Sequence, residues 1–131
     1  MSIGLDTSVL LRLLTGTPEE QAQRALADIQ RRINRLESIV ISDLVITEAY
    51  FALHYHYQVP KAEALKLLAA FLAEAGITAL GSAPSVLATP NLATANPGFV
   101  DRLIHAEYTA KAGSMLTFEK KAARLPSVEV L

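Results

Sequence analysis

Four acidic side chains occupy positions that indicate a shared chemical role: Asp6, Glu48, Asp101 and Glu119. Asp6 closes a short apolar run, and Glu119 directly follows the apolar run SMLTF. Glu48 is the one charge in the apolar segment LVITEAYFAL, where a buried and isolated carboxylate is costly unless a partner compensates it. We therefore expect these carboxylates to need a common compensating partner.

A divalent cation is the partner that these side chains favour. Two ionised carboxylates about 4 Å apart repel by about 4 kcal/mol at an effective dielectric constant of about 20, so four in one pocket require a cation or a protonated member. The candidate ligands are oxygens and the chain has no cysteine, which favours the hard ions Mg²⁺ and Mn²⁺. Such ions activate water and neutralise phosphate charge, so the hypothesis is phosphoryl chemistry with Asp6 as the central metal ligand.

Short apolar strands alternating with amphipathic helices must position the acids. Strands are expected at residues 3–5, 39–41, 77–80, 114–118 and 128–130. The clearest helix begins at Pro18 and continues to Leu36, with apolar residues recurring on one face. The alternation predicts an α/β fold with a mostly parallel sheet of about five short strands, covered on both faces. Ligands in such folds bind outside the carboxyl ends of the strands, and all four acids fall near those ends.

Each acid also has a plain structural explanation. Asp6 can cap the helix that follows it, Asp101 can be a favourable charge near a helix N-terminus, and Glu119 can be a solvated residue of a first turn. Glu48 is the exception, because its neighbours are apolar and no basic residue lies three or four positions away. When each acid is considered singly, a structural role is favoured for Asp6, Asp101 and Glu119, and a functional role is favoured for Glu48.

Three further patterns have competing explanations. His105 follows Asp101 by four residues, which allows a metal or phosphate contact but favours a surface ion pair. The aromatic run AYFALHYHY allows base stacking but favours packing in a core or a dimer. Arg24, Arg31 and Arg35 line one face of the second predicted helix, where they either hold RNA phosphates or are solvated.

The composition limits the class of protein. A chain of 131 residues is most simply one domain with a real core. Its 51% hydrophobic content and mean hydropathy of +0.29 indicate that a partner or a second copy covers part of the surface, so a homodimer is expected. The net charge of −1 does not predict nucleic-acid binding, so any such binding must use a local basic surface. The uncharged stretch 75–100 carries three prolines and is no membrane span; without a leader or cysteine, the expected compartment is the cytoplasm.

The sequence resembles PIN-domain proteins, and specifically the small single-domain PIN ribonucleases that act as toxins in type II toxin–antitoxin pairs. Four segments carry the resemblance: LDTSVLLRLL with Asp6, ISDLVITEAYFAL with Glu48, GFVDRLIHAEYTAKAG with Asp101, and MLTFEKKAARLPSVEVL with Thr117 and Glu119. They follow the order of the family and cover essentially the whole chain. We therefore expect one PIN-like domain over residues 1–131.

The resemblance implies a Rossmann-like, three-layer α/β/α sandwich with a Mg²⁺- or Mn²⁺-dependent endoribonuclease site that hydrolyses RNA phosphodiester bonds. It also implies a homodimer that a cognate antitoxin inhibits. By position, Asp6, Glu48 and Asp101 match the acidic triad of the family, and Ser8 matches a small hydroxyl that supports it. Thr117 is the second supporting residue that the resemblance implies.

Two positions depart from the family pattern. Glu119 stands where the family usually has the aspartate of a TFD motif, and Lys121 occupies a place that is often acidic. Glu119 is thus the fourth candidate catalytic residue and metal ligand, but with a longer side chain than the usual one. The two departures bear on whether a fourth carboxylate and a second metal take part.

Two alternatives remain open. An aspartyl-phosphate phosphatase also places a nucleophilic aspartate after its first strand, but it normally has a second aspartate two residues on, where this chain has Ser8. The other alternative is a PIN-like domain with weakened catalysis that acts as an RNA- or protein-binding module. Metal binding without cleavage of any RNA would favour that alternative.

Overall fold

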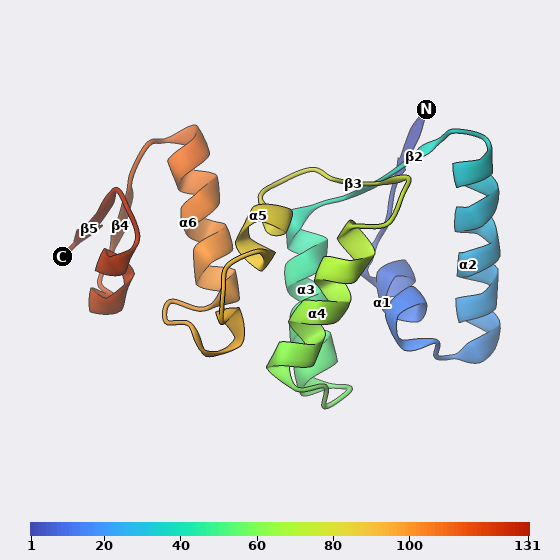
Figure 1. The fold of residues 1–131 in the computed structure, drawn as a ribbon, viewed down its shortest axis with the longest axis horizontal. Helices are drawn as coiled ribbons and strands as arrows, with labels where there is room; N and C mark the ends of the chain where they lie inside the picture. Colours follow the sequence, from blue (N-terminus) through green and yellow to red (C-terminus); the bar gives the residue numbers. More distant parts are fainter. The chain divides into compact units, whose positions relative to one another are not determined.

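The computed structural model describes residues 1–131, and the contacts divide the chain into two compact units, Met1–Leu80 and Gly81–Leu131 (Figure 1). Both units combine short parallel strands with helices, which confirms the predicted α/β class. All five predicted strands are present. They differ from the prediction in forming two sheets, one of three strands and one of two. No helix combines the length and the apolar character that crossing a membrane requires.

The first unit is built on a parallel sheet of three strands in the order β1–β2–β3. These strands are β1 (Ser2–Gly4), β2 (Ser38–Ile41) and β3 (Ile77–Ala79). Ser2 lies opposite Ser38 in the first pair, and Ile39 lies opposite Ile77 in the second. The central strand carries the core, because Ile39 and Ile41 are 0% and 1% exposed. Buried β-branched residues at alternate positions are what a central strand favours.

Four helices of the first unit make the crossovers that parallel strands require. They are α1 (Thr7–Thr15), α2 (Glu19–Asn34), α3 (Asp43–Tyr55) and α4 (Lys61–Leu72). Helix α1 contacts both α2 and α3, and α3 packs against α4. Their largest fully buried side chains are Leu10, Ile46, Leu53 and Leu68. These apolar faces hold the helices of this unit together.

A glycine permits a close approach between α2 and the turn into β3. Gly76 has φ +84°, and a Cβ atom at this position would lie 2.9 Å from Cγ1 of Ile33 on α2. The backbone conformation and the lack of space both exclude larger side chains.

The second unit combines one long helix with a two-stranded parallel sheet. Its elements are α5 (Ala83–Leu87), the 3₁₀ helix η1 (Leu92–Thr94), α6 (Phe99–Lys111), β4 (Met115–Thr117), the 3₁₀ helix η2 (Lys120–Arg124) and β5 (Val128–Val130). Met115 lies opposite Val128 in the sheet, and η2 makes the crossover between the two strands. Helix α5 packs on α6, where Phe99 and Leu103 are buried.

Leu53 and Leu44 give a matched test of the packing of α3, since the first is 0% and the second 77% exposed. Leu53→Ala is expected to lower the free energy of unfolding by about 2 to 5 kcal/mol, because it leaves a cavity in the core. Leu44→Ala is expected to change it by less than about 0.5 kcal/mol. Urea denaturation followed by circular dichroism measures both values. Equal losses would contradict the orientation of α3.

Candidate active site

Asp6 and Glu48 are linked through the residue between them in space, Thr7. The Asp6 carboxylate accepts a hydrogen bond from the Thr7 backbone N–H at 2.8 Å through Oδ1. The Thr7 hydroxyl donates to Oε1 of Glu48, also at 2.8 Å. The second oxygens of the two carboxylates, Oδ2 of Asp6 and Oε2 of Glu48, accept no hydrogen bond. Each acid therefore keeps one oxygen for a ligand.

The parallel pairing of β1 with β2 explains why these residues meet. The carboxyl ends of parallel strands lie at the same edge of a sheet, so the helices that follow them begin side by side. Asp6 is the N-cap of α1, two residues after β1 ends, and Ser42 is the N-cap of α3, directly after β2. Glu48 lies in the second turn of α3, and α3 contacts α1.

The structure corrects the expected environment of Glu48. Sequence neighbours predicted a buried carboxylate, but the Glu48 side chain is exposed. The apolar neighbours Leu44 and Phe51, four residues before and three after it, are themselves 77% and 43% exposed. They share one stripe of α3 with Glu48 and with Tyr55, which is 67% exposed. The compensating partner of Glu48 is thus the Thr7 hydroxyl, within an exposed and partly apolar stripe.

Thr7 was not singled out by sequence reasoning, which assigned the supporting hydroxyl to Ser8. Ser8 lines instead the groove between α1 and α2, where its backbone carbonyl oxygen accepts a hydrogen bond from Arg12. The available signal was the pair of hydroxyl residues that follows Asp6. The packing of α1 against α3 decides which of these two hydroxyl residues faces Glu48. This packing cannot be read from the sequence alone.

Asp101 and Glu119 line one pocket of the second unit, which has a volume of about 230 Å³. Asp101 lies in the first turn of α6, where its charge also favours the helix dipole. Glu119 is the N-cap of η2, and both acids are exposed. Tyr108 and Lys121 line the same pocket, so carboxylates, an aromatic ring and an ammonium group share its walls.

Thr117 holds the backbone of Glu119 in place. The Thr117 hydroxyl accepts a hydrogen bond from the Glu119 backbone N–H at 3.0 Å. Thr117 is the last residue of β4, so this bond fixes how the chain leaves the strand and where the Glu119 side chain begins. The structure thus gives Thr117 a local positioning contact.

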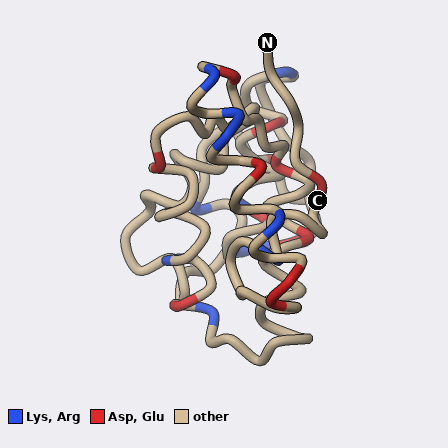
Figure 2. Tube along the Cα trace, turned by 90° about the vertical axis from the view of Figure 1, so that its right-hand side faces the viewer, with Lys and Arg blue, Asp and Glu red and all other residues tan.

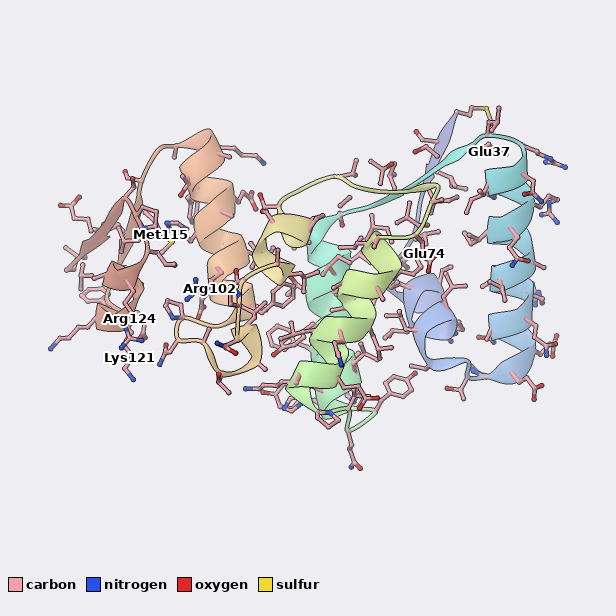
Figure 3. The ribbon with its side chains drawn as sticks, in the orientation of Figure 1. Glu37, Glu74, Arg102, Met115, Lys121 and Arg124 are labelled. Carbon is pink, nitrogen blue, oxygen red and sulfur yellow. The ribbon has the colours of Figure 1, made fainter.

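Two arginines anchor the chain just before α6 and so fix the position of Asp101. Arg102 donates to the backbone carbonyl oxygen of Pro97 at 2.7 Å, and Arg124 donates to that of Asn96 at 3.1 Å (Figure 3). These carbonyl groups accept charge-assisted hydrogen bonds, which are stronger than neutral ones. The start of α6 is therefore fastened both to its own first turns and to η2.

His105 does not pair with Asp101, and the expected surface ion pair is wrong. The imidazole is buried, and its Nε2 donates to the backbone carbonyl oxygen of Pro126 at 2.6 Å. The hydroxyl of Thr109 lies 3.3 Å from the same nitrogen. His105 thus ties α6 to the turn before β5, which is a structural role.

The aromatic run of α3 divides into a buried and an exposed part. Tyr50 is 8% exposed, which agrees with packing in the core, and burial raises the pKa of its phenol above the usual value. The exposed rings of Phe51 and Tyr55 stack with their centroids 6.2 Å apart.

The donor chemistry of the acids fits a hard cation. Mg²⁺ is commonly held by one or two carboxylates and keeps several waters. Asp6 and Glu48 supply two carboxylates in the first unit, and Asp101 and Glu119 line a pocket in the second. The structure contains no group of three or more His, Asp or Glu side chains placed to hold a metal ion.

Comparison with known families gives a match over nearly the whole chain. The model of the PIN domain matches residues 3–127, a range that contains all four acids and runs through both units. No curated protein and no solved structure gives a match. By the extent of the family match, this chain belongs to the PIN domain family.

Proposed function

We propose that this chain is a metal-dependent endoribonuclease that hydrolyses RNA phosphodiester bonds and serves as the toxin of a toxin–antitoxin pair. PIN domains are generally nucleases, so the proposal specifies the substrate and cofactor within a known type of chemistry. The observation that carries it is the linked set of Asp6, Thr7 and Glu48 where α1 and α3 begin. One residue holds both carboxylates, since Thr7 donates its backbone N–H to Asp6 and its hydroxyl to Glu48. Two carboxylates held in this way, each with a free oxygen, suit a cation better than a solvated surface.

In this proposal Asp6, Glu48 and Asp101 are the main metal ligands, and Glu119 is a weaker one. The proposal treats residues 1–131 as one PIN-like domain, which the family match over residues 3–127 supports. Glutamate is one methylene longer than aspartate, which moves its carboxylate away from the place that the shorter acid would occupy. Glu119 therefore acts through water or on a weakly held second ion.

The residues of the chain have mainly positioning roles in this chemistry. Mg²⁺ or Mn²⁺, when bound, neutralises phosphate charge and lowers the pKa of water. Thr7 holds both carboxylates of the first unit, and its hydroxyl occupies Oε1 of Glu48, so that Oε2 would be the oxygen available to a cation. Thr117 fixes the backbone of Glu119 in the second unit. Such preorganisation avoids the cost of rearranging these groups during the reaction.

The proposed partners are a second copy of the chain and a cognate antitoxin. Leu44, Phe51 and Tyr55 form an exposed stripe on α3, with 77%, 43% and 67% of their surfaces accessible. Large apolar side chains gathered on one face are typical of surfaces that a partner covers. The stripe also contains Glu48, so a partner bound there would lie over part of the candidate site.

Metal binding can be measured without any RNA. Excess Mn²⁺ is expected to raise the melting temperature over that in EDTA, since a ligand at 100 times its Kd stabilises the fold by about 2.7 kcal/mol. Asp6→Asn should abolish the rise. Thr7→Val should reduce it because Glu48 loses its donor, whereas Thr7→Ser keeps the hydroxyl and the rise. Identical midpoints with Mn²⁺ and with EDTA in the wild type would contradict the metal site.

Cleavage of one defined single-stranded RNA tests the activity. Asp6→Asn is expected to lower the rate about 100- to 1000-fold, because the loss of one electrostatic group has this effect in other sites. Asn also caps helices, so the variant should keep its fold, which its melting curve in EDTA checks. If Asp6 and Asp101 serve one reaction, the Asp6→Asn, Asp101→Asn double variant should lose little more than either single variant. Wild-type protein that binds Mn²⁺ and RNA but cleaves nothing would favour the binding module.

The four acids are not expected to contribute equally. Asp101→Ala should nearly abolish cleavage. Glu119→Ala should lower it only about tenfold, as expected for a residue that acts through water, and Glu119→Asp should keep or raise it. Rates over a series of Mn²⁺ concentrations separate weaker metal binding from slower chemistry. A loss in Glu119→Ala as large as that in Asp101→Ala would show that Glu119 is a full metal ligand.

A further inference from the structure

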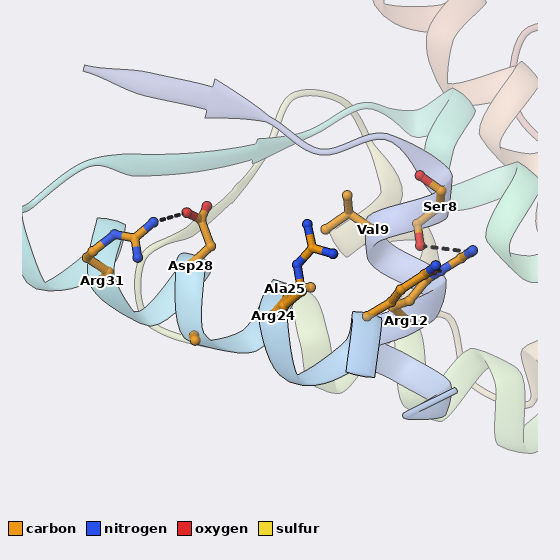
Figure 4. Close-up of a pocket in the computed structure, with 9 residues that line it drawn as sticks. Ser8, Val9, Arg12, Arg24, Ala25, Asp28 and Arg31 are labelled. Atoms are coloured by element: carbon orange, nitrogen blue, oxygen red, sulfur yellow. Dashed lines mark hydrogen bonds and ion pairs between the residues drawn. The ribbon is translucent and has the colours of Figure 1, made fainter. Parts of the chain in front are cut away.

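A basic groove between α1 and α2 has no part in the chemistry above. Its volume is about 670 Å³, and three arginines line it: Arg12 from α1, and Arg24 and Arg31 from α2 (Figure 4). Asp28 is its one acidic lining residue. The groove therefore carries an excess of two positive charges, although the whole chain has a net charge of −1. Acidic and basic positions are interspersed along the chain (Figure 2), so this excess is local.

The arginines of the groove differ in how they are held. Arg12 crosses the groove, since its Nε donates to Oε1 of Gln21 on α2 at 2.8 Å and its terminal nitrogen donates to the Ser8 carbonyl oxygen at 3.3 Å. Arg31 pairs with Asp28. Arg24 has no hydrogen bond or ion pair, and its side chain is exposed and reaches from α2 toward α1 (Figure 4). One guanidinium is thus free for a ligand.

Asp28 neutralises only part of the basic charge. It accepts a hydrogen bond from Nε of Arg32 at 2.7 Å in addition to its pair with Arg31. The hydrogen bond from Arg32 lowers the pKa of this carboxyl below its usual value, so Asp28 is ionised throughout the neutral range. The Arg32 guanidinium is shared with Glu37, at 3.2 Å. Arg12 and Arg24 therefore have no carboxylate partner.

We infer that this groove binds the sugar–phosphate backbone of single-stranded RNA and holds the substrate beside Asp6. The inference rests on the proposed function and adds a binding surface to it. Ser8 lines the groove two residues after Asp6, so a strand that occupies the groove runs directly to the N-terminus of α1. Contacts to phosphates do not read the base sequence, and they set the position of the strand.

Two features favour an RNA backbone over an acidic protein segment. Guanidinium groups present a planar set of donors that matches phosphate and carboxylate oxygens alike, so the choice between them rests on how the charges are arranged. Arg24 and Arg31 are seven residues apart, so they lie on one face of α2 about 10 Å from each other along its axis. This row suits a ligand with charges repeated along its length. The groove also begins at Ser8, two residues after the candidate ligand Asp6.

The test uses the full chain in EDTA, where binding is separated from cleavage. The probe is a fluorescein-labelled single-stranded RNA of mixed sequence and about 12 nucleotides, and anisotropy gives its affinity over a series of KCl concentrations. Arg24→Gln should weaken binding about fivefold at 0.1 M salt and reduce the slope of log K against log salt by about 0.7, the effect of one lost phosphate contact. Arg24 is the informative position because its truncation breaks no contact of the fold.

Two further variants sharpen the result. Lys66→Gln removes the same charge from an exposed position on α4 that does not line the groove, and it should leave affinity and slope unchanged. Asp28→Asn removes the acid of the groove and releases Arg31, so it should tighten binding and steepen the slope. Circular dichroism melts confirm that each variant is folded. Opposite effects of Arg24→Gln and Asp28→Asn, with none from Lys66→Gln, would support the inference.

Equal affinities and slopes for wild type, Arg24→Gln and Lys66→Gln would overturn the inference and leave the groove to an acidic protein partner. This failure is distinguishable from failure of the proposed function. Cleavage of RNA by the wild type, with binding that does not depend on Arg24, contradicts only the groove. Binding that depends on Arg24, without cleavage in Mn²⁺ or Mg²⁺, contradicts only the nuclease.

Discussion

The parallel pairing of β1 with β2 is the constraint on which the candidate site of the first unit depends. Thr7 and Glu48 are 41 residues apart in the chain, and their contact exists because both helices start from the same edge of the sheet. The later turns of α1 and α3 have different neighbours. Their first turns stay together as long as the two strands remain paired. The 2.8 Å hydrogen bond from Thr7 to Glu48 is thus supported by the core around Ile39 and Ile41 rather than by its own strength.

Helix α1 carries two opposite kinds of charge chemistry within two turns. Its N-terminus holds the carboxylates of Asp6 and, through Thr7, of Glu48, while its side toward α2 presents Ser8 and Arg12 to the basic groove. Under the proposed function, an anionic strand would be attracted by the groove and repelled by the acids until a cation neutralised them. The helix is short and packed on two neighbours, so it keeps both surfaces in a fixed relation.

The alternating pattern in the sequence was sufficient to predict the class of fold and nearly every element, because apolar periodicity is a local property. It did not predict that five strands would form two sheets, since strand pairing joins distant segments. The exposure of Glu48 was missed for a related reason. Apolar neighbours in the sequence indicate a buried position only when they are buried themselves, and Leu44 and Phe51 are exposed. The contact of Arg12 with Gln21 depends on how α1 packs on α2, and the spacing of residues in the sequence does not predict this packing.

The division of the chain also has a consequence for the order in which the protein forms during synthesis. Met1–Leu80 contains all three paired strands of its sheet and both members of the Asp6–Glu48 pair, so nothing in this unit waits for later sequence. The remaining segment takes roughly 3 to 10 s to emerge from a ribosome at about 5 to 20 residues per second. Mixed α/β units of this size fold on timescales between those of helical bundles and all-β domains, which are typically shorter than that. If Met1–Leu80 folds by itself, its pair of carboxylates forms on a nascent chain in which Asp101 and Glu119 do not yet exist.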